Sequence, residues 1–164
     1  MSFAAKLRRA PGRVATGAFI LEQGLGKLQA DDETAKHLHD AATSAYPVFE
    51  KLDPKTFTKL LGTGETALGT ALLLPLVPAR FAGLGLAGFA GGLLGLWWRT
   101  PSMHEPNSPR PTPQGVPIAK DSWMLAIGAG LVVDALTARG SERRVARKAE
   151  RRARRQAERE ASAE

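Results

Sequence analysis

Length, charge and composition set narrow bounds on this chain. Its 164 residues fit one domain, and the absence of cysteine excludes disulfides, thiol redox chemistry and cysteine-ligated metal sites. The formal net charge is +7, and residues 139–164 carry most of it, with ten Lys or Arg against five Asp or Glu. A basic segment of this kind favours a partner such as an anionic membrane or a nucleic acid.

The first apolar stretch follows a basic N-terminus. Residues 1–13 carry four cations and no acid, and Pro11-Gly12 is expected to break the chain before a first span at about 14–28. This span is short for a membrane crossing and contains Glu22 and Lys27. It has no clear small-residue cleavage site, so we expect no cleavable signal peptide.

Two helix-start signals come next. The acidic run at 31–33 predicts a short interfacial helix that stops at Tyr46-Pro47. Asp53 as N-cap, with Pro54 at the first helical position, predicts the start of a second span at about 57–77. Its only charges are Lys59 and Glu65.

The most apolar segment runs from 81 to 98 without a charge, after an expected tight hairpin at 78–80. Its glycines include the pairs Gly88 with Gly92 and Gly91 with Gly95, a spacing that predicts close packing against a neighbouring helix in lipid. A soluble bundle is the alternative interpretation, but a chain of 164 residues can hardly cover this segment on every side.

A proline-rich loop at 99–121 leads to a fourth span at about 122–138, capped by Asp121 or Ser122. The tail at 139–164 is expected to be a polar helix or disordered. Four spans put both termini on one side, and the basic N-terminus and tail place that side in the cytoplasm. The sequence therefore predicts an all-α, four-helix membrane domain at 14–138.

Ionisable residues within spans are the best candidates for function, because they must face protein or water rather than lipid. Glu22 and Glu65 lie at similar depth, roughly 9–12 Å from the outer boundary, so we expect them to line one polar pocket and to share a proton or pair with Lys27 or Lys59. The simpler interpretation is a buried hydrogen-bond network. Asp134 is expected to form a structural ion pair with an arginine on the cytoplasmic side, such as Arg13 or Arg80.

The histidines and the basic tail give weaker indications of function. His37, His39 and His104 have too few neighbouring ligands for a metal site and are expected to be solvated. The tail lacks aromatic residues for base stacking, so anionic lipid is a better partner than nucleic acid. Its basic residues for lipid or partner contact are Arg143, Arg144, Arg147, Lys148, Arg151, Arg152, Arg154 and Arg155.

Several motifs together resemble the DoxX family. They are Arg13 through Gly17 to Gly24-Leu-Gly-Lys27 in the first span, Gly62-Thr-Gly-Glu65 to Gly69 in the second, and Lys120-Asp-Ser-Trp123 through Gly128, Gly130 and Asp134 in the fourth. The loop stretch from Arg110 to Gly115 is similar to that of a subgroup of DoxX-like proteins. The resemblance covers about residues 13–138 and leaves out the tail.

The resemblance implies a multi-pass protein of the bacterial cell membrane, linked to quinone- or thiol-dependent oxidoreductase complexes. The lack of cysteine argues against a thiol-based role. Three functions follow as expectations: an accessory subunit of a membrane oxidoreductase system, a quinone-reactive enzyme in which Glu22 and Glu65 handle protons, or a structural membrane protein whose tail recruits a partner. No metal is expected, and quinone is the candidate cofactor.

Overall fold

The computed structural model describes the backbone of residues 3–161 and the side chains of residues 5–138, 140, 148 and 150. Within that range the chain is helical, without strands, and one isolated bridge joins His104 to Pro111. The helices are α1 (Phe3–Leu28), α2 (Asp32–Ala45), α3 (Pro54–Leu73), α4 (Ala79–Arg99), α5 (Val116–Ala119) and α6 (Ser122–Ala161), with 3-10 turns at Pro47–Lys51 and Pro101–Met103.

The predicted starts of α2 and α3 are confirmed. The Asp31 carboxylate accepts a hydrogen bond from the amide of Thr34, and the Asp53 carboxylate accepts one from the amide of Thr56. Each bond satisfies a backbone donor that the first turn of a helix leaves unpaired. The same backbone bond is the main reason why the pKa of Asp31 lies below its ordinary value.

The expected break at Pro11-Gly12 is wrong, because α1 continues through Pro11 as one helix. An internal proline costs a helix about 3 kcal/mol. Arginines on both sides of Pro11 make contacts with other helices: Arg9 binds Asp134, and Arg13 donates to carbonyls at the end of α3. We infer that these contacts outweigh the cost of the proline.

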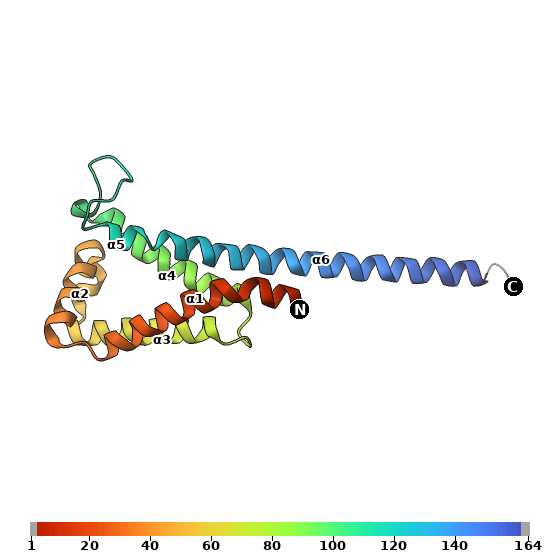
Figure 1. Cartoon of the computed structure of the whole chain (residues 1–164), viewed down its shortest axis with the longest axis horizontal. Coiled ribbons are helices and arrows are strands. Elements are labelled where there is room, and N and C mark those ends of the chain that lie inside the picture. Colours follow the sequence, from red (N-terminus) through yellow and green to blue (C-terminus); the bar gives the residue numbers. More distant parts are fainter. Residues whose placement is uncertain (1–2, 162–164) are drawn as a thin grey trace.

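The four long helices form two antiparallel pairs that splay apart (Figure 1). α1 packs along α3, and α4 packs along the first half of α6, whereas α3 and α4 touch little although they are consecutive. The expected hairpin at 78–80 is therefore wrong: the connection spans residues 74–78 and does not hold α3 against α4. The core joining the pairs contains Ile20, Leu72, Leu86, Met124 and Leu131.

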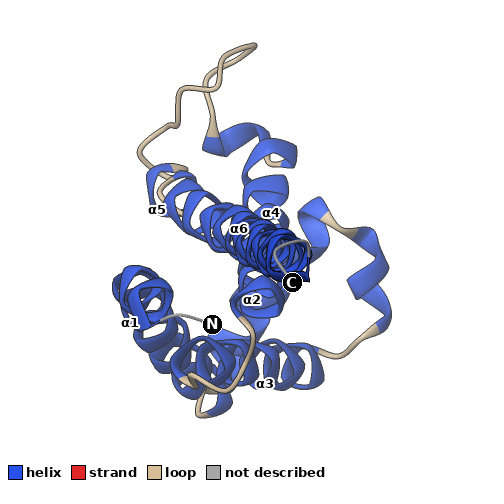
Figure 2. Cartoon of the chain, turned by 90° about the vertical axis from the view of Figure 1, so that its right-hand side faces the viewer, coloured by secondary structure: helices blue, strands red, loops and turns tan. Residues whose placement is uncertain are grey.

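The ends of the molecule differ. At one end α2 spans the opening between the two helix pairs, and the proline-rich loop lies beside it (Figures 1 and 2). At the other end lie the N-terminal part of α1 and the connection between α3 and α4, and from there α6 projects as a single rod. Through Ala161 the tail is helical, as one of the two predicted alternatives had it.

Two segments are long and apolar enough to cross a membrane, Ala79–Arg99 and Val116–Ala138. Only 22% and 17% of their most apolar windows are buried within the chain. A helix in the core of a soluble protein would be mostly buried. The low burial of these two segments therefore weakly favours helices that contact lipid. α1 and α3 do not meet the same criterion of length and composition.

Candidate ligand cavity and its ion pairs

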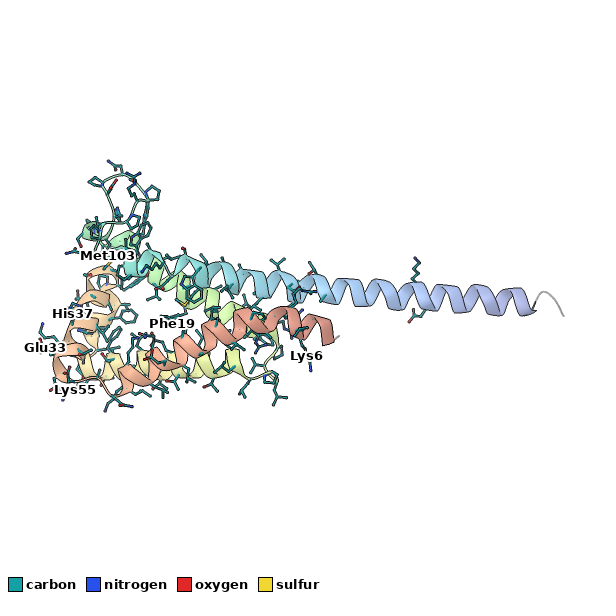
Figure 3. The ribbon with its side chains drawn as sticks, in the orientation of Figure 1. Lys6, Phe19, Glu33, His37, Lys55 and Met103 are labelled. Atoms are coloured by element: carbon teal, nitrogen blue, oxygen red, sulfur yellow. The ribbon has the colours of Figure 1, made fainter. Side chains whose placement is uncertain are left out.

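A cavity of about 660 Å3 lies between the two helix pairs, on the side closed by α2. Figure 3 shows Phe19 of α1 turned into this space. The lining is mainly apolar and aromatic and includes Phe19, Tyr46, Phe49, Phe57, Phe89 and Leu93, and the polar groups that reach it include Gln23, Lys27, Glu65 and Asp121. A large apolar cavity with few polar groups is typical of a small-molecule site.

Glycines of α4 keep this cavity open. Gly88 and Gly92 line it, and a methyl group added at either position would meet nothing within 4 Å. The predicted close packing through Gly88 and Gly92 is therefore wrong within this chain. In the second predicted pair, a methyl group at Gly91 would also meet nothing within 4 Å, whereas one at Gly95 would clash with the Tyr46 hydroxyl. The close approach lies one to two turns earlier, where added methyl groups at Gly83 and Gly128 would stand 2.7 Å from the opposing backbone.

Lys27 and Glu65 form an ion pair in the cavity wall. The Lys27 ammonium lies 2.8 Å from the Glu65 carboxylate, and the side chains are only 17% and 5% exposed. The close approach of opposite charges holds the pair in surroundings that are largely shielded from water. Of the two cations proposed for Glu65, Lys27 is the partner.

The pair forms because α1 and α3 cross at unusually short distance. A methyl group added to Gly24 would lie 2.6 Å from the amide nitrogen of Thr66, and one added to Gly62 would lie 2.9 Å from the carbonyl of Gly24. Only glycine permits this approach. The approach brings Lys27, which lies one turn after Gly24 in α1, against Glu65.

Glu22 does not join Glu65, so the expected pocket of two carboxylates is wrong. Its side chain is exposed, and its carboxylate accepts a hydrogen bond of 2.7 Å from Gln23. The depth along the helix agreed with the prediction, but Glu22 lies two residues before Gly24, about 200° around the helix from the face that meets α3.

Asp121 is the cavity residue that the sequence analysis missed. It directly precedes α6, where it was interpreted as a helix cap, and it lines the cavity. Among the described residues no hydrogen bond or ion pair to this carboxylate is formed, although its backbone carbonyl accepts the amide of Met124. A useful signal was available: Asp121 is the only acid between Val116 and Leu131.

Asp134 forms the expected ion pair with arginines of the basic N-terminal segment, but not with either arginine named as an example. Its carboxylate binds Arg8 and Arg9 of α1, and its backbone carbonyl accepts a further hydrogen bond from Arg9. Arg13 instead donates to four carbonyls at and beyond the end of α3, and Arg80 lies over the ring of Phe81. The continuation of α1 through Pro11 explains why Arg8 and Arg9 are the partners, because it carries them to α6.

The remaining candidates lie apart from the cavity. The His39 ring bonds to the carbonyl of Phe49 and is buried, and His104 stacks on Trp98, so neither is simply solvated, whereas His37 is exposed. The described residues hold no cluster of potential metal ligands. Of the tail residues named above, only the side chain of Lys148 is described, and it is exposed; those of Arg143, Arg144, Arg147, Arg151, Arg152, Arg154 and Arg155 lie outside the described residues.

The fold and the cavity define an all-helical protein with two helices able to span a membrane and an apolar cavity between two helix pairs. No protein-family model matches the sequence, and neither curated proteins nor solved structures match the chain.

Proposed function

We propose that this chain is a multi-pass bacterial membrane protein, similar to the DoxX family, that serves a membrane oxidoreductase system by binding a quinone-type molecule in its cavity. The cavity carries the proposal: it is apolar, it lies between helices with exposed apolar faces, and it has one ion pair in its wall. As an accessory subunit, the chain would present the bound molecule to partner subunits.

The membrane placement is supported by what the chain leaves uncovered. Large apolar side chains are exposed on all four long helices, among them Leu25, Leu60, Leu84 and Val133. The helices alternate in direction, and the N-terminus and the tail lie at the same end (Figure 1). In a bilayer, the four helices would cross in turn, with the basic residues of both termini in the cytoplasm.

The chemistry of the cavity suits a quinone. Its volume of about 660 Å3 lies within the usual range for small-molecule sites, and its aromatic side chains can pack against a flat ring. The Lys27 ammonium can donate to a carbonyl oxygen. When a quinone is reduced to a quinol it takes two electrons, here from a partner subunit, and two protons, which Glu65 and Asp121 are placed to pass.

We expect wild-type protein extracted in mild detergent to retain a quinone and Glu65→Gln to retain about tenfold less. Without the Glu65 carboxylate, the Lys27 ammonium is no longer held where it can donate to the quinone carbonyl, and a hydrogen bond from a charged group contributes about 1.5–3 kcal/mol. The measurement is the ratio of quinone to protein in organic extracts of purified protein.

Glu22→Gln is the matched control, because it makes the same change on the other packed helix, α1, but on an exposed side chain. It should retain quinone as wild type does. Wild-type protein without quinone, or equal retention in both variants, would contradict the proposal, provided that both variants keep the helical content of wild type.

A second function is favoured by one observation, the continuity of α6. The helix leaves the bundle without a break and reaches Ala161, so the basic tail is presented as an extended helix and not as a loose coil (Figure 1). In this proposal the tail recruits a partner protein or anionic lipid to the membrane domain.

We expect deletion of residues 141–164 to abolish copurification of partner subunits while leaving retention of quinone intact. The cavity lies at the α2 end of the bundle and the tail projects from the opposite end, so loss of partner binding should occur without loss of quinone. Affinity purification of full-length and shortened protein from native membranes, with identification of the bound proteins, measures this. Unchanged partner binding in the shortened chain rules out recruitment by the tail.

A further inference from the structure

A small basic pocket lies at the end of the bundle opposite α2. It has a volume of about 100 Å3 and is formed where one face of α1 meets the end of α3 and the start of α4. Lys6, Arg9 and Arg13 of α1 line it together with apolar residues such as Val14 and Leu73. The three cations follow the 3–4 residue spacing of a single helix face. Figure 3 shows Lys6 beside the connection that follows α3.

Among the described residues, positive charge exceeds negative charge around this pocket. Lys6, Arg9 and Arg13 line it and Arg8 lies beside them, and of the side chains that the structure describes, the carboxylate paired with these cations is that of Asp134. Arg9 is almost completely buried, with 4% of its side chain exposed. Excess positive charge beside apolar groups is costly unless an anion neutralises it.

The two arginines are fixed in place. Arg13 donates to carbonyls of Ala71, Leu72, Leu74 and Val77, and Arg9 binds both the side chain and the backbone of Asp134. Lys6 is different: its side chain is exposed, and among the described residues no hydrogen bond or ion pair engages it. A rigid pair of guanidinium groups and a movable ammonium suit an anion that arrives from outside.

We propose that this pocket binds the phosphate group of an anionic phospholipid. The apolar surroundings favour a lipid over a free ion: Leu74 is 45% and Leu76 is 87% exposed in the connection beside the pocket, where acyl chains would cover them. Phosphate suits these charges: the Lys6 ammonium is available to donate a charge-assisted hydrogen bond to it, and the two fixed guanidinium groups add positive potential.

The inference rests on the membrane placement proposed above and is independent of the ligand in the cavity. It is also separate from the tail, because the pocket belongs to the bundle itself. Recovery of the chain without detergent would contradict the membrane placement. The experiment below tests only the phosphate site.

The test is native mass spectrometry of the full-length chain in mixed micelles with equal amounts of phosphatidylglycerol and phosphatidylcholine. We expect wild type to retain phosphatidylglycerol in preference. Lys6→Gln should weaken that binding about fivefold, since one basic side chain near an anionic surface contributes roughly 1 kcal/mol. Lys6→Glu should weaken it further.

Lys51→Gln is the control, because it removes one exposed charge at the α2 end of the molecule and keeps the tail intact. It should bind phosphatidylglycerol as wild type does. Equal losses in Lys6→Gln and Lys51→Gln, or no preference for phosphatidylglycerol in wild type, overturn the site. If inorganic phosphate alone displaces the lipid completely, the anion site stands and its ligand is a free phosphate and not a headgroup.

Discussion

Lys27→Met should lower the free energy of unfolding by about 3–5 kcal/mol, the usual effect of removing one partner from a buried ion pair. The Glu65 carboxylate would stay in the cavity wall with 5% of its side chain exposed and without a cation. Urea unfolding in mild detergent, followed by far-ultraviolet circular dichroism, measures the change.

The double variant Lys27→Met/Glu65→Met separates charge from packing. Replacing both members of a buried pair by apolar residues is often neutral, so most of the lost stability should return. Lys36→Met is the control, since Lys36 pairs with Asp40 on the surface of α2 and both side chains are more than half exposed. It should cause no measurable change. A double variant as unstable as Lys27→Met would show that the pair does not act through its charges.

Gly24→Ala should destabilise the bundle by about 1–3 kcal/mol, the usual range for adding a methylene group to a tightly packed site. The new methyl group would stand 2.6 Å from the Thr66 amide nitrogen and 2.8 Å from the Gly62 carbonyl oxygen. Backbone atoms cannot turn aside as a flexible side chain does, so α1 and α3 must separate. The separation would also pull Lys27 away from Glu65.

Gly26→Ala is the matched control on the same helix, because a methyl group there meets nothing within 4 Å. Alanine is the better helix former by about 1 kcal/mol, so this variant should be as stable as wild type or more so. Thermal unfolding of the two variants in the same detergent compares them directly. A Gly24→Ala protein as stable as Gly26→Ala would mean that the close crossing is not needed.

Local signals in the sequence were sufficient for the helix starts. The acidic run at 31–33 was identified as a helix start and Asp53 as an N-cap. A side chain that accepts an amide hydrogen bond acts within its own turn, and the structure shows such a bond at Asp31 and at Asp53. The failure at Pro11 has the opposite cause. The contacts that keep α1 intact come from α3 and α6, far away in the sequence.

The cavity could be predicted only in part. Glu65 was identified as a buried group because a charge within an apolar stretch must find a partner. Depth alone could not tell that Glu22 faces outward, because rotation about α1 is decided by which glycines meet α3. The role of Gly88 and Gly92 was also hidden, since the same small residues allow either close packing or an open space.

Because α6 is one continuous helix, its projecting part moves rigidly with the part that packs in the bundle. The 23 residues from 139 to 161 extend the helix by roughly 35 Å at ~1.5 Å per residue. Any tilt of the α4–α6 pair relative to the α1–α3 pair is thus magnified at the far tip, so that a rotation of about 10° moves it by roughly 6 Å. A small rearrangement inside the bundle would therefore displace the tip of α6 by several times more, and a partner bound to that tip would move with it.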